Sequence, residues 1–258
     1  MHAYLSGQKL YGDDFTPAEI DAWFADEREG YFELAASNGP YHYAYHQLNI
    51  QHGFRHLPER DFPQVLGLGS AAGDEFDPIR SRCGTITILE PSDGFRNPAF
   101  EYVKPHPSGR MPFATSQFDL ITCFSVLHHI PNVTTVVTEI NRVLRSGGYI
   151  VMHEPIVSMG DWSVPRKGLT KHERGIPIRI FREILAAAGL EVRRERLCAF
   201  SLTSRWQYLL HEPPYNQRWV VKLDEFLCSL PVWFRGYHPR HVWQKLRPMA
   251  VAYVLTKS

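Results

Sequence analysis

The hydrophobic pattern of this 258-residue chain changes along its length between short apolar runs and longer amphipathic stretches. From position 61 to 153 the apolar runs have the length of buried strands, and stretches with a helical period separate them. Strands that alternate with helices are typical of βαβ units and predict a largely parallel sheet. The runs expected to form strands are residues 64–68, 85–89, 118–124 and 149–152.

The clearest amphipathic stretch precedes the fourth of these strands. Its apolar residues fall at helical spacing on one face: Val133, Val136, Val137, Ile140, Val143 and Leu144. We expect the helix to end at Gly147-Gly148, because glycine favours the left-handed conformation of a C-terminal cap. A second helix over 180–189 and two further strands, over 191–197 and 249–255, complete the predicted core.

Residues 1–60 are expected to form a helical lid over this core. Thr16 can cap a helix that begins at Pro17, with Glu19 at the third helical position. A dense group of rings follows, and at least one of its polar side chains is expected to contact a ligand: Tyr41, Tyr45, His46 or Asn49. The alternative is a helix that packs these rings against the core.

The chain therefore divides into four predicted segments. They are the lid over 1–60, the core over 61–204, an aromatic-rich insertion over 205–248 and a last core strand over 249–258. The insertion carries basic side chains beside its rings, namely Arg205, Arg218, Arg235, His238 and Arg240. Such a surface suits a sugar or a phosphate-bearing ligand. A helical cap with its own small core, or the contact of a homodimer, is an equal alternative.

Composition narrows the class of protein. An apolar fraction of 44%, with 13% aromatic residues, supports a substantial core and argues against disorder. The formal net charge of +1 hides a basic C-terminal third, which would suit an anionic partner but is more typical of solvated helix faces. No basic run with interleaved aromatic residues stands out, so we expect no nucleic-acid partner.

The sequence also predicts a protein without a membrane span. No apolar run approaches the ~18–20 residues of a membrane helix, and no basic segment followed by an apolar one begins the sequence. The cysteines Cys83, Cys123, Cys198 and Cys228 form no CxxC pair and have no metal-ligand spacing. We therefore expect reduced thiols, a cytoplasmic location and chemistry that needs no metal.

The most informative stretch runs from Gln64 to Glu90. Its first strand opens into a glycine-rich loop at Gly67, Gly69 and Gly73, where backbone N–H groups can approach a ligand closely. The next strand ends in Glu90, whose carboxylate is well placed to accept hydrogen bonds from both hydroxyls of a ribose. Glycine loop, strand and acid together predict an α/β half-domain that binds a nucleoside.

Four segments in this order resemble the class I S-adenosylmethionine-dependent methyltransferases, in the branch related to small-molecule and ubiquinone-type enzymes. They are the glycine loop over 65–73, Ile88-Leu89-Glu90-Pro91, residues 111–120 running into 126–130, and residues 140–148. The likeness covers about residues 62–200 and the final strand. It implies an α/β, Rossmann-like mixed sheet of seven strands, mostly parallel with an antiparallel last strand, and helices on both faces.

The resemblance also implies S-adenosylmethionine as cofactor and S-adenosylhomocysteine as product, bound over the C-terminal ends of the strands. Around the methionine part it places four loop residues: Gly67, Gly69, Ser70 and Gly73. Around the ribose and adenine it places Glu90, Pro91, Ser92, Ser108, Gly109 and Met111. The floor and the cover of the pocket are expected from Phe124, Ser125, His129 and Tyr45.

Three positions depart from the family pattern. The loop has Gly67 where an acid is usual and Ala71 where a glycine is usual. The loop before Met111 usually offers an Asp to the adenine, and here Ser108 and Gly109 stand there. These departures leave the predicted fold intact and predict weaker cofactor binding, because the missing acid removes one anchor for the cofactor's ammonium group.

His153 and Glu154 are the predicted catalytic residues, because they end a strand at the expected cleft. A hydroxyl acceptor benefits from a general base, and a histidine with a pKa near ~6.5 accepts a proton at neutral pH. A hydrogen-bonded structural role is the alternative for His153, and shaping the pocket is the alternative for the pair His128-His129.

The predicted function is in-line methyl transfer from S-adenosylmethionine to an oxygen of a small polar acceptor, such as a sugar or glycan unit. Two alternatives stay open. A non-catalytic binding or scaffold protein on the same fold is favoured by the departures at Gly67 and Ala71. An NAD(P)-dependent oxidoreductase fits the spacing of the glycine loop poorly.

Overall fold

The computed structural model describes residues 1–30, 32–33, 42–162, 164–233 and 236–257. Tyr41 and Arg235, for which the sequence predicted ligand contacts, lie outside these ranges. Across the described ranges, no helix is both long and apolar enough to cross a lipid bilayer.

Seven strands form one sheet in the order β3-β2-β1-β4-β5-β7-β6. Their bounds are β1 Phe62–Leu68, β2 Cys83–Leu89, β3 Glu101–Val103, β4 Phe118–Phe124, β5 Leu144–Pro155, β6 Leu190–Phe200 and β7 Pro248–Lys257. Strands β1 to β5 pair in parallel, whereas β7 is antiparallel to both β5 and β6. The predicted seven-stranded sheet with an antiparallel last strand is confirmed.

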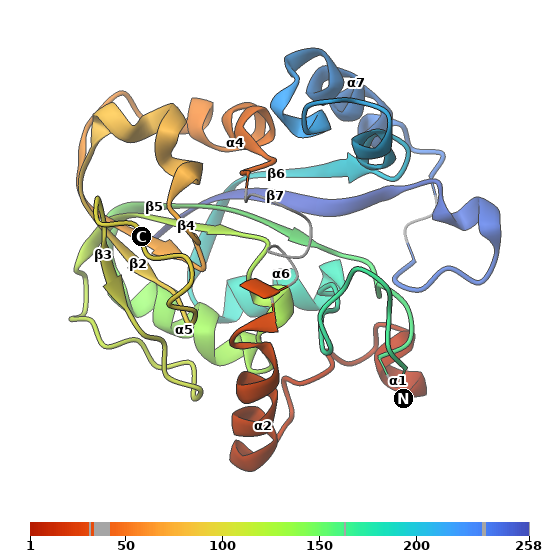
Figure 1. Ribbon diagram of the computed structural model, residues 1–258, viewed down its shortest axis with the longest axis horizontal. Coiled ribbons are helices and arrows are strands. Elements are labelled where there is room, and N and C mark those ends of the chain that lie inside the picture. The colour runs from red at the N-terminus through yellow and green to blue at the C-terminus, as the bar shows by residue number, and fades with distance from the viewer. Residues whose placement is uncertain (31, 34–41, 163, 234–235, 258) are drawn as a thin grey trace.

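Helices cover both faces of this sheet, as the sequence predicted. The α-helices are α1 His2–Leu5, α2 Pro17–Glu27, α4 His46–His52, α5 Val133–Val143, α6 Ile178–Ala187 and α7 Arg218–Ser229. The 3₁₀ helices are Phe54–His56, Asp74–Arg82, Leu127–His129, Thr203–Tyr208, Pro214–Asn216 and Val242–Lys245. Helices α5 and α6 lie on one side of the sheet, and α4 and α7 lie on the other (Figure 1).

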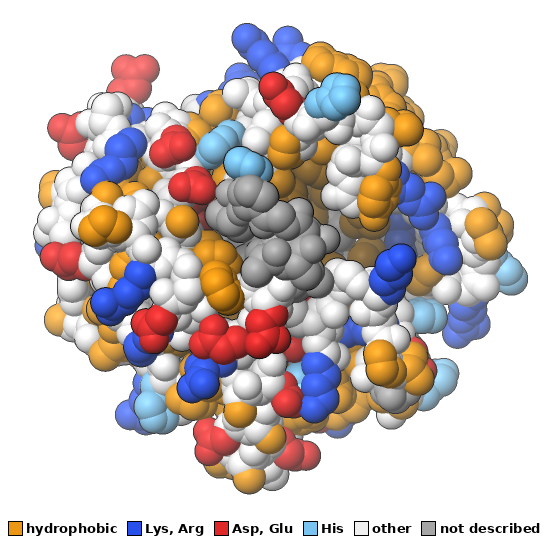
Figure 2. All heavy atoms as spheres, viewed as in Figure 1, with side chains coloured by type: hydrophobic (Ala, Val, Ile, Leu, Met, Phe, Trp, Pro, Cys, Tyr) orange, Lys and Arg blue, Asp and Glu red, His pale blue; other side chains and the backbone are white. Residues whose placement is uncertain are grey.

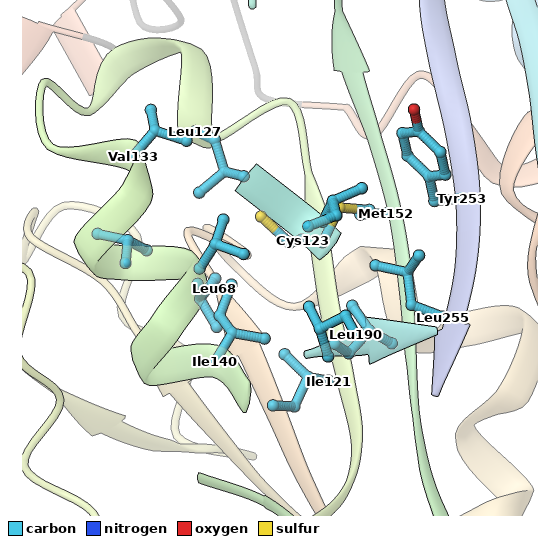
Figure 3. Packing of buried hydrophobic residues seen from close by; sticks show 14 of the residues in the cluster. Leu68, Ile121, Cys123, Leu127, Val133, Ile140, Met152, Leu190, Tyr253 and Leu255 are labelled. Carbon is cyan, nitrogen blue, oxygen red and sulfur yellow. The ribbon is translucent and has the colours of Figure 1, made fainter. Parts of the chain in front are cut away.

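Alternate side chains of the central strands enter two different hydrophobic cores. Leu68, Ile121 and Met152 belong to the core under α5 and α6 (Figure 3). Their neighbours Leu120 and Val151 belong to the core on the other side. Because both faces of these strands are buried, each strand is a nearly continuous apolar run, which is how the sequence identified them.

The expected end of the helix before β5 is wrong. Helix α5 ends at Val143, and Gly147 lies inside β5 with a φ of +71°. Fully buried Leu144 pairs with Phe118, and the register then shifts, so that Leu120 pairs with Tyr149. Strand pairing therefore ends the helix early, and the glycine serves an irregularity in the strand rather than a helix cap.

The N-terminal segment is anchored to the loop after β4. Helix α2 begins at the predicted capping box, in which Thr16 and Glu19 each accept the other's backbone N–H. The buried indole N–H of Trp23 donates to the carbonyl of His129 at 2.6 Å. The fully buried Arg174 guanidinium donates to the carbonyls of Tyr11, Leu127 and Ile130. The N-terminal segment is therefore fixed against the loop that follows β4.

The segment over 205–248 packs on the β6 edge through α7. Val221 of α7 shares a small core with Leu48 of α4 and with Ala250 and Ala252 of β7. Hydrophobic side chains gather on the outside of this segment (Figure 2), where Trp219 and Phe226 are 55% and 60% exposed. The functions expected of this segment, an acceptor cap or a homodimer contact, stay predictions, as does the division of the chain into four segments.

Candidate functional site

A cavity of ≈ 680 Å³ lies at the C-terminal ends of the parallel strands. Strands β1, β2, β4 and β5 contribute the residues where they end, namely Leu68 and Gly69, Leu89 and Glu90, Phe124 and Ser125, and His153 and Pro155. Trp23 of α2 and Tyr45, just before α4, line the cavity from the N-terminal segment. Open α/β sheets bind their ligands at this edge.

Most of the predicted cofactor residues meet at this cavity. Those that line it are Tyr45, Gly69, Ser70, Glu90, Pro91, Ser92, Gly109, Met111, Phe124, Ser125 and His129. Gly67, Gly73 and Ser108 are described residues that do not line it. Gly73 packs under the ring of Phe100, and the Ser108 hydroxyl is bonded to the ring of His106 at 2.8 Å.

The glycine loop is shaped by residues in the left-handed region. Gly69 has a φ of +55°, and a Cβ there would come within 2.8 Å of the Val126 side chain. Ala71, which stands where the family usually has glycine, adopts a φ of +47°. An L-residue in this region costs about 1–2 kcal/mol. The loop thus keeps its shape at Ala71 at some cost in stability.

Glu75 supplies a carboxylate beside the position where Gly67 lacks one. A Cβ on Gly67 would lie 2.2 Å from the Ser70 hydroxyl, so that position has no room for an acid. The Ser70 hydroxyl donates to Glu75 Oε1 at 2.9 Å, and the Thr122 hydroxyl donates to the same oxygen. Burial raises the pKa of Glu75 to about 7, although both hydroxyls oppose the shift.

Glu75 lines the cavity and was missed by the sequence analysis. The family pattern directs attention to the end of β1, whereas this carboxylate comes from the 3₁₀ helix Asp74–Arg82 after the loop. An acid two residues after the last glycine of the loop, Gly73, was the available signal.

Glu90 ends β2 as the sequence predicted, with its side chain buried at the cavity wall. One carboxylate oxygen accepts the backbone N–H of Ala71 at 3.3 Å, and the other accepts that of Ser92 at 3.1 Å. Each oxygen keeps a further lone pair, which suits a ribose with two hydroxyls. Burial raises the pKa of Glu90, and the two backbone N–H groups oppose that shift.

His153 lies in the cavity wall between two aromatic rings. Its imidazole stacks on Phe124 with centroids 5.1 Å apart, and Tyr45 lies at the same centroid distance. Nδ1 is 3.0 Å from Asn49 Oδ1, and among the described residues Nε2 has no hydrogen-bond partner. Burial lowers the pKa of His153 to about 4, so the ring is neutral at physiological pH. With a proton on Nδ1, Nε2 of the neutral ring is a hydrogen-bond acceptor, and this atom is buried.

Glu154, the other predicted catalytic residue, does not line the cavity. Its fully buried carboxylate accepts the backbone N–H groups of Val126 and Leu127, both at 2.8 Å. It also lies 3.0 Å from Nδ1 of His128. These contacts support a positioning role for Glu154, because they fix the loop after β4 and the ring of His128.

A cluster of histidines and carboxylates forms another part of the wall. His128 Nε2 lies 3.6 Å from Glu173 Oε1, and His129 Nδ1 lies 3.0 Å from Glu27 Oε2. Burial alone would lower the pKa of His128, but its hydrogen bonds to Glu154 and Glu173 raise it to about 9. The sequence missed Glu27 and Glu173, because only the fold brings them to the two histidines.

The described arginines and lysines of the 205–248 segment do not line this cavity, whereas Tyr215 does. His238 instead bonds the Ser158 hydroxyl at 2.7 Å. Arg28 and Arg110 line the cavity from other segments. The geometry therefore gives no support from this segment to a phosphate-binding site.

Comparisons with known proteins agree with this geometry. Residues 66–152 match the family model of a methyltransferase domain. The sterol 4-C-methyltransferase strm-1 of Caenorhabditis elegans is 27% identical over 150 residues, which are 50% of this chain and 44% of that relative. The chain therefore matches less than half the length of this curated relative.

Solved structures share the fold at low sequence identity. A S-adenosylmethionine-dependent methyltransferase from Thermotoga maritima has a TM-score of 0.51 and 15% identity, with 93% of this chain and 99% of that chain covered. The [4+2]-cyclase SpnF has a TM-score of 0.56 and 16% identity, with 94% and 97% covered. The matched domain, the order of the motifs and the sheet lead to one conclusion. Residues 66–152 match a methyltransferase domain and the sheet has the class I methyltransferase fold, and S-adenosylmethionine is the cofactor that such a domain implies.

Proposed function

We propose that this protein transfers a methyl group from S-adenosylmethionine to a hydroxyl of a small acceptor with a flat, largely apolar body. The observation that carries the proposal is that Gly69 and Ser70 of the glycine loop, Glu90 and His153 line one cavity. O-methylation benefits from a nucleoside-binding site that holds the cofactor and from a neutral histidine that can accept a proton in the same cavity.

The residues at one end of the cavity fit the cofactor. Glu90 would accept the ribose hydroxyls, and Gly109 and Met111 would flank the adenine. Gly69, Ser70 and Glu75 would surround the methionine part, with the Glu75 carboxylate facing its ammonium group in place of the acid missing at Gly67. When bound, S-adenosylmethionine supplies an electrophilic methyl group on a sulfonium leaving group.

The lining supports an acceptor with an aromatic or alicyclic body. The rings of Tyr45 and Tyr215 both line the cavity, with centroids 5.8 Å apart and planes 18° from parallel. Phe24, Phe95 and Phe124 add apolar surface. A sugar, the acceptor expected from the sequence, is the alternative that the product test must separate, because its apolar face can also stack on such rings.

His153 is the proposed general base. Its Nε2 is buried in the structure, so a neighbouring side chain must move before this atom can take the proton of the acceptor hydroxyl. The acceptor oxygen forms its new bond to the methyl carbon as the proton leaves. Asn49 holds the opposite ring nitrogen at 3.0 Å, which fixes the orientation of the imidazole. Alignment of the reactants in such a site can contribute up to about 7–11 kcal/mol to the rate.

Binding tests the cofactor part of the proposal. We expect S-adenosylmethionine and S-adenosylhomocysteine to raise the melting temperature by several degrees and NADH to leave it unchanged. A ligand at 100 times its Kd stabilises the native state by roughly 2.7 kcal/mol. A shift with NADH alone would support an oxidoreductase, and no shift with any of the three would support the scaffold alternative.

Product analysis tests the reaction. The protein is incubated with S-adenosylmethionine that carries a tritiated methyl group and with phenols, alicyclic alcohols, free sugars or sugar phosphates. We expect label on a phenol or alicyclic alcohol oxygen, located by mass spectrometry. Label on a sugar alone would overturn the acceptor class, and turnover to a carbon- or nitrogen-linked methyl group would overturn O-methylation.

A further inference from the structure

We propose that His128, His129 and Glu173 form a binding site for a divalent transition-metal ion in the wall of the cavity. One ligand atom from each of the three lies within 4.8 Å of the other two. His128 Nε2 and Glu173 Oε1 are 3.6 Å apart. Ligand atoms on one Zn²⁺ ion lie at about 2.0–2.2 Å from the metal, so a small inward movement would close the site.

A carboxylate contacts the Nδ1 atom of each histidine ring. Glu154 Oε2 lies 3.0 Å from His128 Nδ1, and Glu27 Oε2 lies 3.0 Å from His129 Nδ1. A histidine that binds a metal almost always donates its other ring N–H to a carboxylate or a carbonyl, which fixes the tautomer. Glu154 is in turn held by two backbone N–H groups of the same loop. The surroundings of a metal site are therefore already built.

Charge in this part of the wall favours a cation. Glu27, Glu154 and Glu173 are each at most 9% exposed, and the two histidines face them. The nearby guanidinium of Arg174 donates to the carbonyls of Tyr11, Leu127 and Ile130 rather than to these carboxylates. Arg166 likewise donates to backbone carbonyls, including that of Glu173, so these carboxylate oxygens are left to the two histidines and to a cation between them.

The donor set indicates which ion. Two histidines and one carboxylate are the ligands of catalytic zinc sites with an open position, and of non-haem iron sites. Both histidines and Glu173 line the cavity, so the open position would face its interior. If the proposed function holds, that position would take an oxygen of the acceptor, and otherwise it would hold water. The sequence predicted no metal because the ligands come from two loops far apart in the chain.

Zinc binding by the whole purified protein tests the site without cofactor or acceptor. The metal-free protein is titrated with Zn²⁺ in competition with a chromophoric chelator, and Co²⁺ replaces Zn²⁺ to report the ligands by its visible absorption. We expect one site per chain in the wild type. E27Q removes the carboxylate that holds the His129 ring, and we expect it to lower zinc affinity by about 10- to 100-fold. H129Q and E173Q remove a ligand and should lower zinc affinity more.

The matched control is H172Q. His172 lies next to Glu173 in the same loop, but its ring bonds Asp26 at 2.8 Å and is outside the cluster. The zinc affinity of H172Q should therefore equal that of the wild type. Thermal melting identifies a variant that fails to fold, and either H129Q or E173Q alone suffices for the comparison. No saturable zinc binding by the wild type, or equal loss in H172Q and E173Q, would overturn the proposal. Because S-adenosylhomocysteine binding is measured separately, failure here leaves the proposed function untouched.

Discussion

The two ends of the cavity shift the pKa values of buried carboxylates in opposite directions. At the glycine-loop end, Glu75 meets only hydroxyls, and burial raises its pKa to about 7. At the histidine end, burial opposes ionisation of Glu173, but its contacts with His128 and His129 lower its pKa to about 2. The partner rather than the depth therefore decides whether a buried acid is charged. One end can switch its charge near neutral pH, and the other is permanently ionised.

His153 belongs to neither end of the cavity, and its substitution should have the largest effect on activity. We expect H153Q to lower kcat by about 10²–10⁴-fold, the usual contribution of a general base. S-adenosylhomocysteine binding, measured by calorimetry, should stay unchanged. Because the base must be neutral and its pKa is about 4, the wild-type kcat at saturating S-adenosylmethionine should stay flat as the pH falls from 8 to 6. H211Q, at an exposed histidine outside the cavity, is the control. A drop of kcat in H153Q matched by H211Q would refute the assignment.

Glu90 tests whether the two ends act independently. E90Q removes the charge that would accept the ribose hydroxyls, and a hydrogen bond to a charged group contributes about 1.5–3 kcal/mol. We therefore expect the Kd for S-adenosylhomocysteine to rise by about 10- to 100-fold for each bond lost. Zinc affinity at the histidine end should not change. If E90Q weakens both ligands equally, the cavity is one coupled site and the comparison of its ends fails.

Glu75 should make cofactor binding depend on pH. Below pH 7 its carboxyl is mostly protonated and offers no charge to the ammonium group, so affinity should rise as the pH increases through 7. Between pH 6 and 8 we expect up to about a tenfold gain for the wild type and none for E75Q, measured by equilibrium dialysis. A pH-independent wild type would separate Glu75 from the cofactor.

The same residue should lower stability above neutral pH. Its pKa is raised from 4.5 in the unfolded chain to about 7 in the folded one, so the folded protein binds more protons between these values. Stability from this group is fully present below pH 4.5 and is lost as the pH rises through 7. E75Q should therefore unfold at higher urea concentration than the wild type at pH 8, and the gain should shrink below pH 7. An unchanged difference across this range would contradict the assigned pKa.

Ala71 should show the smallest effect. In A71G, glycine adopts the left-handed conformation without strain, but it also raises the entropy of the unfolded chain. We expect the first effect to be larger, so that the free energy of unfolding rises by up to about 1 kcal/mol. Melting temperature measures this gain. A72G is the matched control and should lose stability, because Ala72 lacks a positive φ. A lower melting temperature in A71G would mean that packing of the buried methyl group outweighs the strain.

The sequence predicted those elements whose structure is determined by residues close together in the chain. Strands such as Phe118–Phe124 were identified because they are buried on both faces, and Glu90 was identified because it ends one of them. The three-residue strand β3 was missed because it is too short to carry a pattern. The helix end at Val143 was missed because pairing of Leu144 with Phe118 overrides the local glycine signal.

The histidine end could not be predicted, because long-range packing assembles it. Glu27 and His129 are separated by 102 positions, and no local period relates them. Glu154 was expected in the cleft, since it follows His153 at the end of β5. Side chains alternate along a strand, so when His153 lines the cavity its neighbour points away from it.

The position of β7 in the sheet has a consequence for the order of folding. Strand β6 joins the sheet only through β7, since the order at that edge is β5-β7-β6. During synthesis β6 leaves the ribosome before β7 and must wait unpaired for a partner that is made later. Met249 and Ala250 of β7 also line the cavity, so the ligand site closes only when this late strand inserts. A nascent chain arrested before residue 248 should therefore hold the glycine loop without a complete binding site.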